Sequence, residues 1–402
     1  MKTKFRKLFL IAAAIMLISV IFCFSVSAKD IDASGECGEN VRWTYYGSTN
    51  KLVISGTGAM EDFNFFVFDE IVSASPFAET DIKTVVIEEG VTSIGQTAFL
   101  NCVSLTSVSL PDSIEVIGDS AFRNCRRLSK INFPNGVSTI KGAAFYNCDS
   151  LTKLSLPVNT TVIETEAFYD CDGIEFVNVP HGVTRIEKST FAMCDNLKSV
   201  DLGNGVTSLG YGAFAWCTSL KNVDIRSNIT EMDATVFSET PWLKNQPKGM
   251  VYVGKCAYIY NGEMPKNAKV TIKDGTSFIV PGAFYGQSNL KTLDIPASVT
   301  FIGYAAFSDC DGLKYVYYRG TKAQWKNVDV GSSGNSSLLN AKFYYGNTPV
   351  TEPTTQPTTP PTTQPTTKPQ EPTNTTPSST SASNANLTIT LPDDSTGTNL
   401  TM

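Results

Sequence analysis

Apolar residues recur along most of this chain with a period of 23 residues. An Ala-Phe pair, or Thr-Phe or Val-Phe in its place, marks the period, and a cysteine follows three residues later in seven repeats. The phenylalanines are Phe99, Phe122, Phe145, Phe168, Phe191, Phe214, Phe237, Phe284 and Phe307. The cysteines are Cys102, Cys125, Cys148, Cys171, Cys194, Cys217 and Cys310. A fixed period of this length is typical of repeat proteins, in which each repeat forms one structural unit.

Each repeat predicts the same short elements. The consensus is L-x-x-V-x-L-P-x-x-V-x-x-I-G-x-x-A-F-x-x-C-x-x, and the copy that begins at Leu105 follows it closely. The alternating Val-x-Leu predicts a strand, the proline a turn, and a second extended stretch leads into a brief helical or 3-10 turn that carries Ala-Phe. One repeat cannot bury its own apolar side chains, whereas stacked repeats cover one another and pair their strands. We therefore predict a leucine-rich repeat solenoid of 23-residue coils over residues 77–349.

Segments that break the period lie at both ends and in the middle of the solenoid. Residues 29–76 include the alternating stretch 41–56, which predicts a β-hairpin that covers the exposed strand edge at the N-terminal end. Residues 316–346 are expected to cap the other end. An irregular insertion at 238–268 replaces about one coil and contains two strand-like runs. This second hairpin either forms an unusual coil within the stack or projects sideways from it.

The two termini differ in composition from the repeats. Residues 1–28 have basic residues, an apolar stretch and small residues before Lys29, which together predict a signal peptide cleaved after Ala28. The alternative is a retained membrane anchor. Residues 350–380 are a Thr/Pro-rich linker with too little apolar surface to fold, and 381–402 form a short polar tail. We therefore expect a disordered C-terminal tail, no transmembrane segment in the mature chain, and a secreted or cell-surface location.

Charge and composition argue against several classes of function. The chain has 402 residues, 32 Lys and Arg against 38 Asp and Glu, and one histidine. An acidic chain is a poor partner for nucleic acid, and a lone histidine disfavours most metal and proton-transfer sites. That residue, His181, follows Pro180 in a predicted solvated turn. We expect no catalytic, cofactor-binding or metal-binding residues, and no enzyme activity.

The repeated cysteines are expected to be buried free thiols. They occupy one inward position of successive coils, so they lie along a line with parallel side chains, which suits neither a disulfide nor a tetrahedral zinc site. Cys37 and Cys256 lie outside this row, several coils apart. All these thiols then act as small apolar side chains.

Four sequence blocks in a shared order resemble the BspA-like family of bacterial leucine-rich repeat proteins. The first block is SGECGENVRWTYYGSTNKLVISGTGAM, and the second is the Ala-Phe-x-x-Cys repeat itself. The third is TPWLKNQPKGMVYVGKCAYIYNGEMP followed by IKDGTSFI, and the fourth is YYRGTKAQWKNVDVGSSGNSSLLNAKFYYG. The resemblance covers residues 33–346 and implies an extracellular interaction protein, since several relatives act as adhesins.

The outward side of the first predicted strand in each coil, named here the sheet face, is the candidate binding surface. In L-x-x-V-x-L the valine and the second leucine point inward, so the residues before them point outward. Phe176 is either a binding hot spot or an aromatic packed by Lys153, and the C-terminal cap covers the Tyr315 and Tyr317 pair or leaves it exposed. The candidate binding residues are Lys130, Asn132, Lys153, Phe176, Asn178, Asp201, Asp224, Tyr315 and Tyr317.

The sequence therefore predicts a non-catalytic protein that binds a protein or glycan partner through the sheet face. Its role would be of the adhesion type, at the cell surface or after secretion. The alternative is a non-catalytic accessory component of an extracellular assembly that degrades polysaccharides, presented on the Thr/Pro-rich linker.

Overall fold

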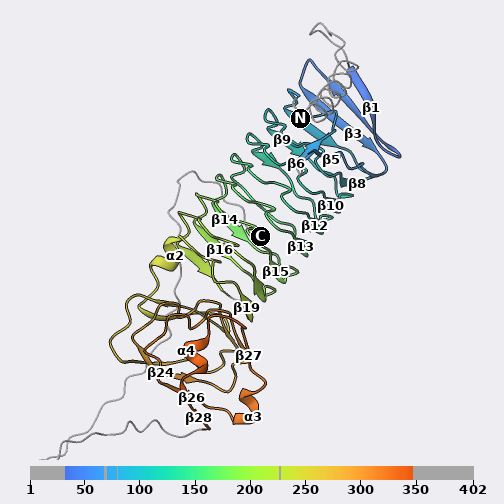
Figure 1. Ribbon diagram of the computed structural model, residues 1–402. Coiled ribbons are helices and arrows are strands. Elements are labelled where there is room, and N and C mark those ends of the chain that lie inside the picture. Colours follow the sequence, from blue (N-terminus) through green and yellow to red (C-terminus); the bar gives the residue numbers. More distant parts are fainter. Residues whose placement is uncertain (1–31, 68–69, 79, 226–227, 347–402) are drawn as a thin grey trace, which may run out of the picture. The chain divides into compact units, whose positions relative to one another are not determined.

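A computed structural model describes residues 32–346, apart from 68–69, 79 and 226–227. The expected signal peptide at 1–28, linker at 350–380 and polar tail at 381–402 lie outside the described residues. Within the described part the chain winds into a β-solenoid of about 11 turns (Figure 1). The predicted leucine-rich repeat solenoid is confirmed.

The first column of strands follows the Val-x-Leu positions and forms the sheet face. Strands one coil apart pair in parallel, so that Phe176 lies opposite Ser199 and Ser199 lies opposite Asn222. The strands hydrogen-bond in the orders β3-β7-β9-β11, β14-β16-β18 and β22-β24-β26-β28. They are β3 (Lys51–Gly56), β7 (Thr84–Ile87), β9 (Ser107–Ser109), β11 (Lys130–Ile131), β14 (Phe176–Asn178), β16 (Ser199–Asp201), β18 (Asn222–Asp224), β22 (Ala268–Thr271), β24 (Leu290–Ile295), β26 (Tyr315–Tyr318) and β28 (Lys342–Tyr345).

The second column follows the later extended stretch of each coil, and in most copies an isoleucine or leucine points into the core, with Met232 in this place in β19. Its strands hydrogen-bond in the orders β4-β8-β10-β12-β13, β15-β17-β19 and β21-β23-β25-β27. They are β4 (Gly58–Ala59), β8 (Val91–Ile94), β10 (Val116–Ile117), β12 (Thr139–Ile140), β13 (Val162–Ile163), β15 (Arg185–Ile186), β17 (Ser208–Leu209), β19 (Glu231–Met232), β21 (Cys256–Asn261), β23 (Phe278–Ile279), β25 (Phe301–Ile302) and β27 (Asp329–Val330).

The third side of each coil, named here the turn face, carries the Ala-Phe pair. Its turns use hydrogen bonds between residues three apart, as in a 3-10 helix, for example from Cys102 N to Phe99 O. Each turn also bonds to the next coil, since Phe99 N donates to Ala121 O at 2.8 Å. In most coils, residues two before and two after the phenylalanine have positive φ, such as Ser120 and Asn124. These left-handed residues stop the turn from continuing as a helix.

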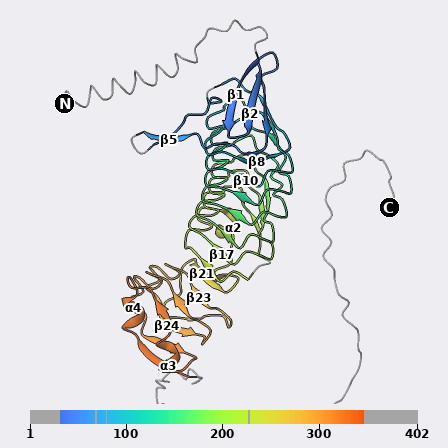
Figure 2. The same ribbon diagram turned by 90° about the vertical axis from the view of Figure 1, so that its right-hand side faces the viewer.

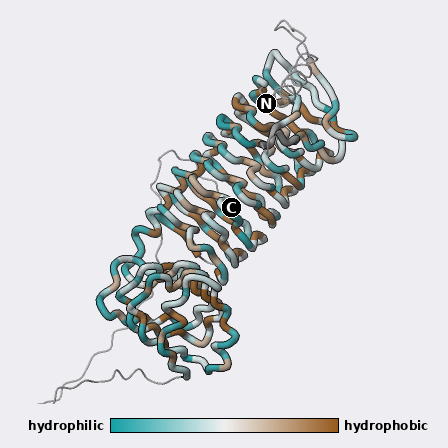
Figure 3. The backbone as a smooth tube through the Cα atoms, viewed as in Figure 1, coloured by the Kyte–Doolittle hydropathy of each residue, from teal (hydrophilic) through white to brown (hydrophobic). Residues whose placement is uncertain are grey.

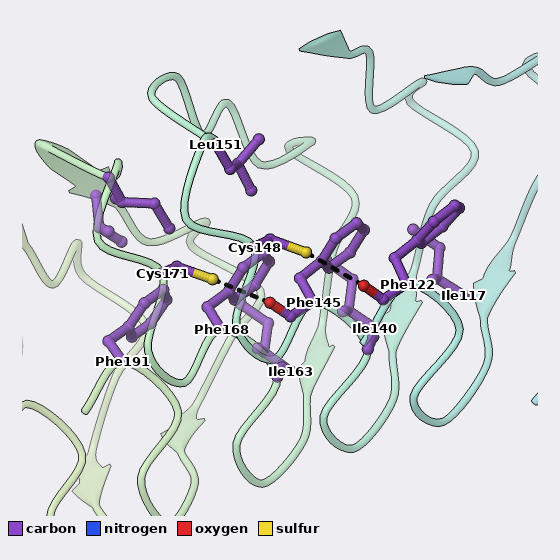
Figure 4. Close-up of a cluster of buried hydrophobic side chains, with 14 of the residues drawn as sticks. Ile117, Phe122, Ile140, Phe145, Cys148, Leu151, Ile163, Phe168, Cys171 and Phe191 are labelled. Atoms are coloured by element: carbon purple, nitrogen blue, oxygen red, sulfur yellow. Dashed lines mark hydrogen bonds between the residues drawn. The ribbon is translucent and has the colours of Figure 1, made fainter. Parts of the chain in front are cut away.

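The core is a stack of phenylalanine rings. From Phe77 to Phe237 the rings are buried, and those of adjacent coils stack with centroids 5.2–5.7 Å apart. Each repeat cysteine donates its S–H to the carbonyl oxygen of the phenylalanine one coil back, as Cys148 does to Phe122 at 3.2 Å (Figure 4). Apolar residues therefore recur as bands across successive coils (Figure 3).

An antiparallel cap covers the N-terminal end, as predicted. Its hairpin consists of β2 (Val41–Tyr46) and β3, and the structure adds a third strand, β1 (Asp32–Gly38), on the outer edge. The Trp43 ring meets Phe77 edge to face at 5.7 Å and so covers the first ring of the stack. A further hairpin of β5 (Asn64–Val67) and β6 (Glu70–Ser73) stands off the side of the coils (Figure 2).

The irregular insertion forms part of the stack. Helix α2 (Pro241–Lys244) places the Trp242 ring 4.5 Å from Phe237. The hairpin of β20 (Gly249–Val253) and β21 then joins the second column, because β21 pairs in parallel with β23. The insertion is therefore an unusual coil rather than a lateral projection. The buried core divides into two clusters at this coil.

The C-terminal segment forms the last coil of the solenoid and so covers its end. Strand β27 joins the second column and β28 the first; the short helix α3 (Lys322–Trp325) leads from β26 to β27, and α4 (Ser336–Leu339) leads from β27 to β28. The Trp325 ring packs between those of Tyr318 and Phe343, with ring centroids 5.1 and 4.7 Å away, respectively. Among the described residues, no helix has the length and apolar character needed to cross a bilayer.

Candidate interaction surface

Seven of the nine predicted binding residues lie on strands of the sheet face. Lys130 lies on β11, Phe176 and Asn178 on β14, Asp201 on β16, Asp224 on β18, and Tyr315 and Tyr317 on β26. The register matches the predicted outward rows, with Asn178 opposite Asp201 and Asp201 opposite Asp224. Asn132 and Lys153 lie outside the strands.

The sheet face is interrupted, although the consensus predicts a paired strand in every coil. The carboxamide of Asn132 bridges to the preceding coil, donating to Leu110 O at 2.9 Å and accepting from Leu110 N at 3.1 Å. This side chain makes bonds that a strand would make through its backbone, and β11 ends at Ile131. Residues 151–157 of the next coil form no strand. Asn132 therefore has a structural role, and the exposed Lys153 lies in the gap between two sheets.

Phe176 is the most prominent apolar side chain on the sheet face. It is 55% exposed, whereas Val177 beside it points inward and is buried. Its cross-strand neighbour on β16 is Ser199, which is too small to cover a phenyl ring. An exposed aromatic among short polar residues suits binding, because aromatic side chains are enriched at the centres of protein interfaces.

The acidic residues at this face are already engaged within the fold. The Asp201 Oδ1 atom accepts the N–H of Gly203 at 2.9 Å, so this carboxylate stabilises the turn that follows β16. Asp201 and Asp224 both have further interactions. They are therefore poorer candidates for a ligand contact than Phe176.

Tyr315 and Tyr317, the two outward-facing tyrosines of β26, form an aromatic group with the last strand. Tyr344 on β28 stacks on Tyr317 with centroids 4.8 Å apart and lies 6.4 Å from Tyr315. Lys342 lies opposite Tyr315, with its ammonium nitrogen 5.2 Å from the centroid of the Tyr344 ring. Tyr315 and Tyr317 are both half-buried, so the terminal coil packs against their sides and extends the row.

Arg319 is a charged residue beside this group that the sequence reasoning missed. Its guanidinium bonds to Asp294 Oδ1 at 2.9 Å, to Asp274, and to the backbone oxygen of Ile272 at 3.0 Å. These partners come from neighbouring coils, so Arg319 holds the last coils together. No local motif marks such a contact, because its partners lie 25 to 47 residues away in the chain.

The cysteines lie in the core, and the histidine lies in an exposed turn. The nine cysteines of the described residues are free and buried. Burial raises the pKa of Cys102 and of Cys217 to about 12, which disfavours the reactive thiolate. His181 is exposed in its turn. Within the described ranges, no three His, Cys, Asp or Glu residues gather as a metal site would require.

Comparison with known proteins identifies related sequences and folds. The family model for BspA-type leucine-rich repeat regions matches residues 70–198, 139–261 and 256–328, which together span 70–328. No curated protein matches the chain. The chain is similar to the solved leucine-rich repeat protein of T. pallidum, with 24% identity over 52% of this chain and 90% of that chain and a TM-score of 0.39. A leucine-rich repeat protein from Bacteroides ovatus is 20% identical over 80% and 79% of the two chains, with a TM-score of 0.40.

Proposed function

Since this chain belongs to the BspA-type leucine-rich repeat family, whose members are typically surface proteins that interact with other proteins, we propose that it is a secreted or cell-surface protein that binds a partner protein through the sheet face. The binding is of the adhesion type and involves no catalysis. The observation that carries this proposal is the exposed Phe176 ring on β14.

The surroundings of Phe176 support a protein contact at this point. The ring stands over short polar neighbours, and exposed lysines, Lys130 and Lys153, lie toward the preceding coils. Burying an exposed phenyl ring in an interface contributes about 1.5–3 kcal/mol. The lysines add charge that favours an acidic partner surface and accelerates association.

The test uses the full chain with two parallel probe sets, an array of extracellular proteins and an array of polysaccharides. Phe176→Ala is the diagnostic variant, and Val103→Ala is the matched control, because Val103 is 53% exposed but lies on the turn face. We expect Phe176→Ala to weaken binding to the captured protein at least about tenfold, the equivalent of 1.4 kcal/mol. Val103→Ala should leave the affinity unchanged.

Two results would count against the proposal. Equal affinity of Phe176→Ala and the unaltered chain would remove the sheet face from the binding surface. Binding to polysaccharides alone would favour the accessory role in a polysaccharide-degrading assembly.

A further inference from the structure

The second residue after each repeat phenylalanine adopts a left-handed conformation with positive φ. Asparagine, aspartate and glycine suit this conformation, whereas a bulky residue there is an outlier. Most coils follow this preference, but Met193 with φ 61°, Trp216 with φ 63° and Glu239 with φ 60° depart from it in three adjacent coils, and the first two of these side chains are apolar. The row is Asn101, Asn124, Asn147, Asp170, Met193, Trp216, Glu239, Gly286 and Asp309.

Met193 and Trp216 gain little burial in exchange for this strain. Their side chains are 40% and 54% exposed. Their backbones are held in the left-handed form, since Met193 N donates to Ala215 O at 2.9 Å and Trp216 N to Ser238 O at 2.8 Å. An apolar side chain that is both strained and exposed does little for the fold, which points to a contact outside it.

Two tyrosines enlarge this apolar area into what we name the turn-face patch, which comprises Tyr169, Met193, Tyr211 and Trp216. The Tyr169 hydroxyl donates to the sulfur of Met193 at 2.7 Å and so fixes that side chain. Tyr211 lies in the same coil as Trp216 and is 56% exposed. Monomeric proteins rarely gather several large exposed apolar side chains unless the area has a partner.

Carboxylates border the turn-face patch. Asp172 and Asp195 hold the same position, next to the cysteine, in consecutive coils, and Asp170 lies beside them. Burial, and then repulsion from Asp172 and Asp195, raises the pKa of the Asp170 carboxyl, while Arg126 offsets part of the rise. Asp172 Oδ1 accepts the N–H of Asp195 at 3.2 Å, and Asp195 Oδ1 accepts the hydroxyl of Thr218 at 2.9 Å, so both groups are fixed in place. Like charges on neighbouring coils repel one another, and a cationic partner would relieve this repulsion.

We propose that the turn-face patch docks a basic segment of a partner protein. An apolar side chain of that segment packs against Met193 and Trp216, while its lysine or arginine side chains lie beside the three aspartates. The indole face of Trp216 also attracts a cation. This surface is on a different side of the coil from Phe176, so it is a second contact, independent of the sheet face.

The test is a selection of displayed random short peptides on the full chain, followed by affinity measurement with the enriched peptides. The diagnostic variants are Met193→Asn and Trp216→Asn, singly and together, since asparagine is the residue that other coils use at this position. We expect enrichment of peptides that combine lysine or arginine with an apolar residue. The double variant should bind them at least about tenfold more weakly, with a melting temperature equal to or above that of the unaltered chain.

Control variants separate this surface from the rest of the molecule. Phe176→Ala should leave peptide affinity unchanged, as should Tyr285→Asn, which alters a tyrosine that is 63% exposed in a later coil. Raising the salt concentration to about 0.5 M should weaken binding of the basic peptides, because salt screens exposed charges.

Several outcomes would overturn the proposal. They are the absence of enrichment for basic and apolar peptides, enrichment of acidic ones, and equal binding by the double variant. A lower melting temperature of the double variant without loss of affinity would mean that Met193 and Trp216 serve the fold alone. Sedimentation that shows a dimer dependent on Trp216 would assign the patch to a second copy of this chain.

Discussion

Replacing Tyr258 with phenylalanine tests how the ladder of hydrogen bonds between the turn faces of successive coils ends at the irregular coil. In regular coils the phenylalanine N–H donates to a backbone oxygen of the next coil, as Phe214 N does to Val236 O at 2.9 Å. After Phe237 the irregular coil offers a different acceptor, because Phe237 N donates to the hydroxyl of Tyr258 at 3.2 Å. Tyr258 is only 1% exposed, so water does not replace a lost hydroxyl there.

The size of the effect follows from this geometry. Tyr258→Phe removes only the hydroxyl acceptor. It keeps the aromatic ring, which meets the Phe237 ring edge to face with centroids 6.1 Å apart. A buried donor left without a partner costs about 1–3 kcal/mol. We therefore expect the free energy of unfolding to fall by about that amount.

Urea unfolding measures the global effect, and hydrogen exchange at the Phe237 amide measures the local one. The second measurement matters because repeat proteins can unfold in parts. Tyr285→Phe is the matched control, since Tyr285 is 63% exposed, and its change should stay within about 0.5 kcal/mol. Unchanged stability together with unchanged protection of the Phe237 amide in Tyr258→Phe would refute the reasoning.

Three further predictions concern the last coil and the thiols. Asn335→Ala should lower the free energy of unfolding by at least about 2 kcal/mol, because the buried Asn335 side chain accepts the N–H of Phe307 and donates to Gly303 O and Gly331 O. Urea unfolding measures this change, and Asn340→Ala, at an exposed asparagine, serves as the control. In the native protein the nine buried cysteines should resist iodoacetamide and react only in urea, as read by mass spectrometry; rapid native labelling would contradict their burial. Burial raises the pKa of the Cys102 and Cys217 thiols from 9.0 to about 12, so these thiols lose their protons at lower pH in the unfolded chain than in the folded one. The free energy of unfolding should therefore fall between pH 9 and pH 12 by about 1.4 kcal/mol per pH unit for each such thiol. Thermal melts that show no loss of stability above pH 9 would contradict this.

The repeat could be read from the sequence because it depends on which side chains are buried. The spacing of Phe99 and its successors predicts the coils, and the alternation in 41–56 predicts the hairpin cap. Phe77 escapes this reading, since Pro-Phe replaces Ala-Phe, no cysteine follows three residues later, and the step to Phe99 is 22 residues. The structure nevertheless places Phe77 first in the stack, 5.4 Å from Phe99.

Features that depend on backbone partners could not be read in this way. Asn132 fits the outward row by its position, yet its carboxamide bonds to Leu110 and the sheet stops there. Met193 and Trp216 resemble ordinary variable positions until their positive φ is known. In each case the decisive hydrogen-bond partner belongs to the neighbouring coil, and the consensus of a single repeat does not contain it.

The ladder on the turn face has a consequence for how such chains change over evolutionary time. An internal coil meets the same backbone groups on either side, so a duplicated or deleted block of 23 residues leaves every remaining junction chemically equivalent. The ends of the ladder are different, because Tyr258 and Asn335 supply acceptors that no repeat provides. Unequal recombination within the repeats can therefore lengthen or shorten the binding surface in one step, provided that both breakpoints fall between Phe99 and Phe237.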